Sequence, residues 1–547
     1  MPKIDDNAGA LGTPTAKGVG ISRCQPEELT LHERRANPAH EITVEDLHHV
    51  HMVGIGGVGM SGVARILLDR GYTVTGSDMK ESRTILALRA AGAVIATEHC
   101  ADNLALTSET PTCVVTSFAA IPQDNAELIR ARELGIPVVT RSDVLGALLR
   151  DHVGLLIAGT HGKTSTTSLT IVALQQAGLD PSFAVGGQLS TTGTNAHHGT
   201  GSVFVAEADE SDASLLTYSP NVAVVTNIEA DHLDFYGSEE SYIRVFDEFA
   251  GRVVDGGFLV ICVDDRQAAE LGERLIKDGD GRIHVVGYGT VEAAARHPSI
   301  PMCVKITDIT PKAESTHAVI RIAPPDGRQG GVSCGASDQT GECVYHLAIQ
   351  IPGTHMVLNA AAAIASAVLV GADWERAVSG VNSFQGVRRR FESHGTIAHG
   401  YFEGASVYDD YAHHPTEVRA VLTAAREKIE SMMPVLGRER RVIVVFQPHM
   451  YSRTEEFAED FAHALSLADE AIVMDIYGAR ERPRPGVTSD LIINQMTIPT
   501  HASHRIDDVP RLVASIAGPG DIILTMGAGT VTMLADPIVA ALNESLQ

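Results

Sequence analysis

The sequence of 547 residues has few basic residues, few cysteines and no long apolar run. Its 42 lysine and arginine residues stand against 68 aspartate and glutamate residues, which gives a formal charge of -26 at pH 7. Nucleic acids and anionic membranes are bound by surfaces rich in Lys and Arg, so this balance argues against both as partners. Any anionic ligand must therefore meet a local cluster of cations.

The seven cysteines include no C-x-x-C pair. Their odd number and scattered positions fit neither a disulfide framework nor a zinc ribbon, so we expect free thiols in a reducing cytoplasm. The N-terminus carries Asp5 and Asp6 where a signal peptide has positive charge, and it lacks an apolar core. No stretch reaches the roughly 18 apolar residues that span a bilayer. The nearest, LNAAAAIASAVLVGA at 358–372, predicts a buried helix. We therefore predict a cytoplasmic protein.

The length and the alternation of strand-like and helix-like segments predict an α/β protein of several domains. Residues 1–45 are rich in Gly, Pro and charge without periodicity, which is typical of a disordered tail, and order should begin near Leu47. Residues 46–150 open with a strand, a glycine turn, a helix and a second strand. This order predicts a Rossmann-like domain.

The remaining chain predicts two more α/β domains. Residues 151–386 repeat the strand, glycine turn and helix, and include a β-rich part at about 282–351 with an exposed loop near Gly330. Residues 387–547 contain three strand-like runs that end in Gly, His or Asp and predict a second Rossmann-like domain. Because open α/β sheets bind ligands at the carboxyl ends of their strands, we expect the functional residues there.

A phosphate-binding loop is the strongest single motif. The segment Gly159-Thr160-His161-Gly162-Lys163-Thr164 follows an apolar strand and opens a helix. Backbone N–H groups at a helix start bind phosphate oxygens, the Lys reaches the β and γ phosphates, and the Thr hydroxyl can ligate Mg²⁺. The general G-x-x-x-x-G-K-[ST] spacing is not met, because Ile157 occupies the first glycine position. The alternative is a plain strand-to-helix turn.

A second glycine-rich loop spans Gly54–Gly59 and satisfies G-x-G-x-x-G, with Asp78 at the end of the next strand. Taken alone, this pattern predicts a nicotinamide dinucleotide. The same geometry fits any diphosphate that approaches the backbone closely, including that of a UDP-sugar. The loop therefore predicts a diphosphate without deciding which one.

Acidic residues crowd two further strand ends. Glu207, Asp209, Glu210 and Asp212 follow one strand, and Asp231 with His232 follows the next. Mg²⁺ prefers oxygen ligands and keeps waters and substrate phosphates, so a carboxylate near Thr164 is chemically reasonable. The alternative for some of these residues is helix capping.

Cationic and aromatic residues gather in the last third of the chain. Arg388, Arg389 and Arg390 offer three guanidinium groups, which match phosphate or carboxylate, although a charge run is more often a solvated surface. The segment 409–415, DDYAHHP, is too polar and aromatic for an ordinary turn. Gln447-Pro448-His449 ends another strand.

Together these motifs resemble the Mur ligase family from about Leu47 onward. The resemblance rests on the segments GIGGVGMSGVA, GTHGKT, EADESD, TNIEADHLD, LNA-x-AA, RRF, DDYAHHPTE, FQPH-x-Y-x-RT and MGAGT, which occur in the family's order. The family has its own shortened phosphate loop, which removes the spacing objection. The resemblance implies three domains that hold UDP-N-acetylmuramate, ATP and L-alanine in turn, in an ATP-dependent ligase of peptidoglycan synthesis that acts as a monomer or homodimer.

The resemblance also implies roles for single residues. The catalytic residues would be Lys163, His232, Arg390 and His413. ATP would contact Gly159, Thr160, His161, Gly162, Lys163, Thr164, Asn359 and Asp410. Magnesium would bind Thr164 and Glu207, and His232 would serve a second metal or the γ-phosphate. The substrates would contact Gly56, Gly57, Gly59, Ser77, Asp78, Ser117, Arg389, Tyr411, His413, His449 and Arg453.

Three positions depart from the family pattern. The family usually has Asn at the position of Met356 and Arg at that of Met450, and neither methionine replaces those hydrogen bonds. Binding of the alanine carboxylate would then pass to Arg453. Several relatives carry a carbamoylated lysine where this chain has Asp247. Two alternatives stay open: its native carboxylate takes the place of that group, or no such group is needed.

Three alternatives stay open at this point. An NAD-dependent oxidoreductase would explain GIGGVG and Asp78 but would leave GTHGKT, EADESD and DDYAHH without a role. A non-catalytic nucleotide-binding regulator would not need three strand ends rich in Glu, His and Arg. Within the family, a muropeptide-recycling ligase that accepts a tripeptide is the nearest alternative.

Overall fold

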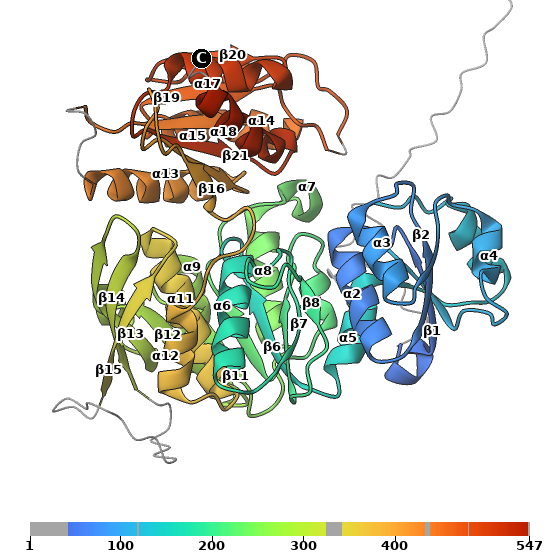
Figure 1. The fold of residues 1–547 in the computed structure, drawn as a ribbon. Helices are drawn as coiled ribbons and strands as arrows, with labels where there is room; N and C mark the ends of the chain where they lie inside the picture. Colours follow the sequence, from blue (N-terminus) through green and yellow to red (C-terminus); the bar gives the residue numbers. More distant parts are fainter. Residues whose placement is uncertain (1–41, 118–119, 324–341, 433–437, 480, 545–547) are drawn as a thin grey trace, which may run out of the picture. The chain divides into compact units, whose positions relative to one another are not determined.

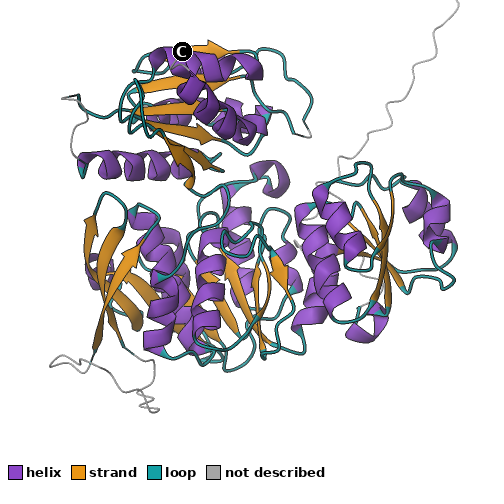
Figure 2. Ribbon diagram, in the orientation of Figure 1, coloured by secondary structure: helices purple, strands orange, loops and turns teal. Residues whose placement is uncertain are grey.

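The computed structural model describes residues 42–117, 120–323, 342–432, 438–479 and 481–544. His40–Gln547 form one compact unit, in which three sheets follow one another along the chain (Figures 1 and 2). Residues just before Leu47 are already folded, because Ile42 is buried and a 3-10 turn, η1, spans Val44–Leu47. The backbone N–H of Thr43 donates to Asp46 at 2.8 Å and closes this turn. Residues 1–41 of the predicted tail lie outside the described residues.

The first sheet is parallel and has the strand order β3-β2-β1-β4-β5. This order, with helices on both faces (Figure 2), is the doubly wound arrangement predicted for the segment. All five residues of β1 are buried, as expected for a strand covered on both faces. The elements are β1 (His49–Val53), α2 (Val58–Asp69), β2 (Thr73–Ser77), α3 (Arg83–Ala90), β3 (Val94–Ala96), η2 (Ala101–Ala105), β4 (Cys113–Thr116), α4 (Ala126–Glu133), β5 (Val138–Thr140) and α5 (Arg141–Leu149).

The second sheet has ten strands in the order β15-β14-β13-β12-β11-β10-β6-β9-β7-β8. The elements up to α8 are β6 (Val153–Ala158), α6 (Lys163–Gln176), β7 (Ser182–Ala184), β8 (Ala196–His197), β9 (Val203–Glu207), η3 (Ser214–Thr217), β10 (Val222–Val225), α7 (Leu233–Tyr236) and α8 (Glu239–Ala250). The later ones are β11 (Phe258–Cys262), α9 (Arg266–Asp278), β12 (His284–Thr290), α10 (Val291–Arg296), β13 (Met302–Pro311), β14 (Thr316–Ile322), β15 (Cys343–Ile349), α11 (Thr354–Leu369) and α12 (Trp374–Asn382).

The predicted β-rich part is an extension of this second sheet. β14 pairs antiparallel with β13 on one side and with β15 on the other, and β13 continues the parallel strands through β12 (Figure 1). The loop predicted near Gly330 lies outside the described residues. As predicted, the apolar run 358–372 is largely a buried helix, α11. This helix packs beside α6.

The third sheet has the order β16-β17-β21-β18-β19-β20, with β16 antiparallel and the others parallel. Its buried strands pack against α17 and α18 on one side. The elements are β16 (Glu392–Thr396), β17 (Ser406–Asp410), α13 (Pro415–Glu430), β18 (Val442–Phe446), α14 (Tyr451–Glu456), α15 (Ala458–Leu465), β19 (Glu470–Met474), α16 (Asp490–Ile493), β20 (Thr500–Ser503), η5 (Ile506–Asp508), α17 (Val509–Ile516), β21 (Ile522–Met526), η6 (Thr530–Leu534) and α18 (Ala535–Glu544).

The cysteines correct one expectation. Cys100, Cys113, Cys262 and Cys303 are free thiols, as predicted. Cys343 is disulfide-bonded, and its partner lies outside the described residues. The scattered spacing of the cysteines gave no sign of this pairing. Among the described residues, no helix is both long and apolar enough to cross a membrane.

Candidate active site

The turn between β6 and α6 forms the predicted phosphate-binding loop. Gly159 and Gly162 have φ of 131° and 82°, in the left-handed region that favours glycine. A Cβ on Gly162 would lie 2.8 Å from Oδ1 of Asn359, so this position also has no room for a side chain. The 14-residue helix α6 begins directly after this turn at Lys163. Its first backbone N–H groups and the positive end of its dipole favour an anion at the loop.

Lys163 lies inside the loop and is paired with an acidic residue of the next strand end. Its Nζ donates to the backbone oxygens of Gly159 at 2.7 Å and Thr160 at 3.1 Å, and to Oε1 of Glu210 at 2.8 Å. Burial alone lowers the pKa of Lys163, but Glu210 and Asp209 outweigh it and raise the pKa above its ordinary value. The ammonium group is therefore charged at the loop. Burial raises the pKa of Glu210 to about 7, against the opposing charge of Lys163.

The acidic strand ends meet beside this loop, because β9, β6 and β10 are parallel neighbours. Glu207, the last residue of β9, accepts a hydrogen bond from the backbone N–H of Gly186 at 2.8 Å. A Cβ on Gly186 would lie 3.0 Å from Oε2 of Glu207, and one on Gly187 would lie 2.9 Å from Cγ2 of Thr164. Thr164 and Glu207 thus pack against the same pair of glycines.

Asp231 and His232 follow β10. Asp231 accepts two hydrogen bonds from Nη2 of Arg453, at 3.0 and 3.1 Å, in a buried ion pair. Burial alone raises the pKa of Asp231, but the Arg453 guanidinium outweighs it and the net pKa lies well below its ordinary value. His232 lies 3.6 Å from Asp231 and has a φ of 55°. Burial lowers the pKa of His232, which favours the neutral imidazole.

A cavity of about 1010 Å³ opens at the loop and at these strand ends. The predicted site residues that line it are Thr160, His161, Gly162, Lys163, Thr164, Glu207, His232, Arg389, Arg390, Tyr411 and His413. Val58, at the start of α2, lines it as well. Residues from the segments of all three sheets therefore face one cavity.

A smaller, mostly apolar cavity of about 230 Å³ adjoins the loop on another side. Its lining includes Met356, Asn359 and Asp410, and Nδ2 of Asn359 lies 3.8 Å from Sδ of Met356. Burial raises the pKa of Asp410 to about 6, although Arg390 opposes it. His161, Gly162, Arg390 and Glu417 line both cavities. A ligand at the loop can thus extend from one cavity into the other.

The three consecutive arginines have different surroundings. Nη2 of Arg389 donates to the backbone oxygen of Gly527 at 2.6 Å, and its Nε lies 3.5 Å from Asp409. The guanidinium groups of Arg389 and Arg390 lie 4.6 and 5.3 Å from the ring centre of Tyr411. Within the described residues, the side chains of Arg388 and Arg390 make no ion pair or hydrogen bond. These two cations line the larger cavity and are available to a ligand.

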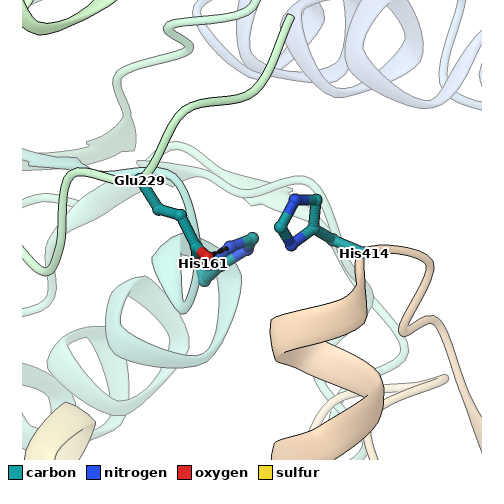
Figure 3. A group of neighbouring side chains, drawn as sticks. All are labelled: His161, Glu229 and His414. Carbon is teal, nitrogen blue, oxygen red and sulfur yellow. Dashed lines mark hydrogen bonds and ion pairs between the residues drawn. The ribbon is translucent and has the colours of Figure 1, made fainter. Parts of the chain in front are cut away.

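His161 lies at the centre of a cluster that joins the phosphate loop to the start of α13. Figure 3 shows it between Glu229 and His414. Its Nε2 lies 2.9 Å from Oε2 of Glu229, and its Nδ1 lies 3.4 Å from Oε1 of Glu417. Burial alone lowers the pKa of His161, but these two carboxylates outweigh it and raise the pKa to about 9. His161 is therefore an imidazolium with an acidic partner on each side.

His414 differs from His161 in charge, although the centres of the two rings lie only 4.8 Å apart. Burial and the nearby charge of His161 lower the pKa of His414 to about 4, so that this ring is neutral. Its Nδ1 accepts from the backbone N–H of Thr416 at 3.4 Å and caps α13. The hydroxyl of Thr416 donates to Oε1 of Glu229 at 2.6 Å, which adds a second contact between α13 and the loop cluster.

Only some of the residues predicted to bind the substrate L-alanine line the larger cavity. Tyr411 and His413 line it, whereas His449 and Arg453 line neither cavity. The ring of His449 lies 5.7 Å from that of His413 and stacks on Tyr477 at 5.8 Å. Arg453 is the residue expected to bind the alanine carboxylate, because position 450 is Met and not Arg. Its Nη2 donates to Asp231.

The glycine-rich loop before α2 is held by Asp78, whose Oδ2 accepts from the backbone N–H of Gly56 at 2.9 Å. A Cβ on Gly59 would lie 3.0 Å from Cδ of Arg141, so a further cation lies next to the loop. Ser77 is buried, and its hydroxyl donates to Glu127 at 2.7 Å. Of the other predicted residues, Gly57 precedes α2 and Ser117 follows β4. None of the predicted residues of this segment lines either cavity.

Two acidic residues of the site were missed from the sequence. Glu229 lies within TNIEADHLD and Glu417 within DDYAHHPTE, and neither was singled out. The only available signal was the spacing of Glu417, four residues after His413, which places both at the start of one helix. The contact of either residue with His161 depends on the tertiary fold.

Comparison with known proteins matches three domain families along the chain. Residues 49–153 match the Mur ligase family catalytic domain, residues 157–367 the Mur ligase middle domain, and residues 389–529 the Mur ligase glutamate ligase domain. These three matches follow the three sheets in order.

Whole proteins match over nearly the full chain. The UDP-N-acetylmuramate–L-alanine ligase of Rhodococcus opacus is 51% identical over 520 residues, 91% of this chain and 97% of that protein. The solved UDP-N-acetylmuramate-alanine ligase of Thermotoga maritima has a TM-score of 0.69 at 26% identity, covering 91% of this chain and 99% of the other. A murein peptide ligase of Psychrobacter arcticus shares the fold, with a TM-score of 0.61 at 22% identity over 91% and 99% of the two chains.

Proposed function

The chain belongs to the Mur ligase family, and from this premise we propose that it joins L-alanine to UDP-N-acetylmuramate with consumption of ATP. The products are the amide, ADP and phosphate, and the reaction serves peptidoglycan synthesis. The observation that carries the proposal is that the loop with Lys163 lines both cavities, beside Arg388 and Arg390, whose side chains form no ion pair in the described part of the chain. The 51% identity to the UDP-N-acetylmuramate–L-alanine ligase of Rhodococcus opacus supports L-alanine as the amino acid.

ATP is needed because a carboxylate is a poor electrophile and its oxygen a poor leaving group. The lactyl carboxylate of the sugar attacks the γ-phosphate, the bond to ADP breaks, and an acyl phosphate forms. The adenine occupies the smaller cavity, next to Asn359 and Asp410. The phosphates follow the loop into the larger cavity, where Lys163 and Arg390 stabilise the charge on the transferring group.

The residues at the loop also fit a magnesium ion. The hydroxyl of Thr164 and the carboxylate of Glu207 are hard oxygen donors at the same cavity, where Glu207 packs against Gly186 and Thr164 against the next residue, Gly187. Magnesium would supply charge neutralisation for the phosphate oxygens there. Burial lowers the pKa of His232, and its imidazole lines the same cavity, where it would contact the γ-phosphate or a second ion.

The amino acid enters the same cavity. Its amine must lose a proton before it attacks the acyl phosphate, and the imidazole of His413 lines the cavity close to Tyr411. The sugar nucleotide reaches the cavity past Val58 from the glycine-rich loop, whose backbone and nearby Arg141 suit a diphosphate. An NAD-dependent oxidoreductase is not favoured, because the family match accounts for both glycine loops.

Phosphate release with UDP-N-acetylmuramate, ATP and each amino acid in turn tests the proposal. We expect release that depends on all three substrates and is fastest with L-alanine. The variant Lys163→Ala should lower turnover at least about a hundredfold, because removal of one group that stabilises the transition state typically has this effect. Retained turnover in this variant, or a preference for a tripeptide over alanine, would contradict the proposal.

A further inference from the structure

The imidazole of His413 is held by one nitrogen and open at the other. Its Nδ1 lies 3.1 Å from the backbone oxygen of Tyr411 and 3.2 Å from Oε2 of Glu417. Both partners are acceptors, so Nδ1 carries a hydrogen in every protonation state. In the neutral ring, Nε2 is then the basic nitrogen. No described residue forms a hydrogen bond or ion pair with this Nε2.

Glu417 is anchored at several points, so it gives this ring a fixed partner. Its Oε2 accepts from the backbone N–H of His413 at 3.0 Å, and its Oε1 lies 3.4 Å from Nδ1 of His161. The side chain is only 13% exposed. Burial alone raises the pKa of Glu417, but His413 and His161 outweigh it and hold the pKa well below its ordinary value. A buried, ionised carboxylate therefore faces Nδ1 of His413.

We propose that Glu417 is a positioning residue that fixes His413 as the base for the amino-acid substrate. This inference rests on the proposed ligase activity. The carboxylate keeps the hydrogen on Nδ1, directs the lone pair of Nε2 toward the cavity, and stabilises the imidazolium that forms. A carboxylate next to a catalytic histidine has the same three effects in hydrolytic triads.

The ammonium of alanine gives a proton to Nε2 of His413, and the neutral amine attacks the carbonyl carbon of the acyl phosphate. The carbon–nitrogen bond forms and the bond from that carbon to the phosphate oxygen breaks. The phosphate leaves with the electron pair and takes the second proton of the nitrogen.

Glu417 also belongs to the capping box of α13, which by itself would be a purely structural role. The two roles differ in what they predict for different nucleophiles. A base is needed for alanine, whose amine is protonated at neutral pH, but not for hydroxylamine, which is largely neutral there. Loss of the cap alone would affect both nucleophiles alike.

The test compares the two nucleophiles in the full-length variant Glu417→Gln, whose amide oxygen can still accept the cap hydrogen bonds. With ATP and UDP-N-acetylmuramate, we expect amide formation with alanine to fall about a hundredfold, as for loss of a general base. Hydroxamate formation with hydroxylamine should stay within about twofold of wild type. Glu430→Gln, at the exposed end of the same helix, is the matched control and should change neither rate.

A second variant keeps the inference testable if Glu417→Gln folds poorly. His413→Ala leaves the carboxylate and its cap in place, and should likewise lose the alanine reaction while it retains hydroxamate formation. Equal loss of both products in these variants, or loss of neither, would overturn the inference. If the wild-type protein forms neither product from these substrates, the proposed ligase activity itself fails.

Discussion

The charge on His161 should stabilise the folded protein in a pH-dependent way. The substitution His161→Gln removes the titrating group but keeps an amide that can still hydrogen-bond Glu229. In the wild type, the two carboxylates raise the pKa of His161 from 6.5 to about 9. At about 1.36 kcal/mol per pKa unit, this rise corresponds to about 3 kcal/mol of stability. The lowered pKa values of Glu229 and Glu417 express the same ion pairs and add nothing further.

The sign of the effect follows from the direction of the shift. Because the pKa of His161 is raised in the folded state, its charge stabilises the folded protein fully below pH 6.5. This contribution is lost as the pH rises through about 9. Urea unfolding without nucleotide, at several pH values, measures it. By linkage, the free energy of unfolding of the wild type should exceed that of the variant by about 3 kcal/mol at about pH 6 and by about 2 kcal/mol at about pH 7.5. The difference should be close to zero at about pH 10.

The test depends on how the difference in free energy of unfolding between the wild type and His161→Gln changes with pH, and not on the absolute size of that difference. Any hydrogen bond or packing that the substitution changes adds a constant to the difference at every pH. A difference of the same size at about pH 6 and about pH 10 would show that His161 is not an imidazolium between two carboxylates. The account of the loop cluster would then be wrong.

Three further outcomes are expected. Gly162→Ala should weaken binding of a fluorescent ADP analogue at least about tenfold, because its Cβ would meet Asn359. Gly71→Ala is the control for backbone strain, because Gly71 has a similar φ of 80° but open space around it, and this variant should leave binding unchanged. Arg453→Ala should lower the free energy of unfolding by about 3 to 5 kcal/mol, measured by urea unfolding, because Asp231 stays buried without its cation; a loss below about 1 kcal/mol would contradict this. Arg388→Ala should raise KM for alanine or for the sugar nucleotide at least about tenfold in the phosphate-release assay. The reason is that the Arg388 guanidinium lines the larger cavity without an acidic partner in the described residues. An unchanged KM for both substrates would refute this prediction.

Strand ends could be predicted from the sequence because their pattern is local. Apolar runs that stop at Gly, His or Asp place Lys163, Glu207 and His232 at the carboxyl ends of parallel strands, and in the structure β9, β6 and β10 are neighbours. The positions of these three side chains at one cavity follow from that sheet order. Local pattern and tertiary placement agree here.

Side-chain partners could not be predicted in the same way. Asp231 and Arg453 are 222 residues apart, and Thr416 and Glu229 are 187 apart, so no periodicity links them. The sequence predicts Arg453 as a ligand of the alanine carboxylate, and it gives no sign that this guanidinium is paired with Asp231. Which cations stay free therefore depends on acidic residues in distant segments.

Met356 lines the smaller cavity with a buried thioether beside Asn359, where the family resemblance leads us to expect an amide. Sulfur is polarisable and a weak acceptor, and the methionine side chain adapts its shape to what it contacts. A competitive inhibitor that fills this cavity with a flat, apolar ring against the sulfur should gain affinity here, and should lose it in relatives that require an amide partner. Selectivity among ligases of one fold could thus be designed on a single side chain.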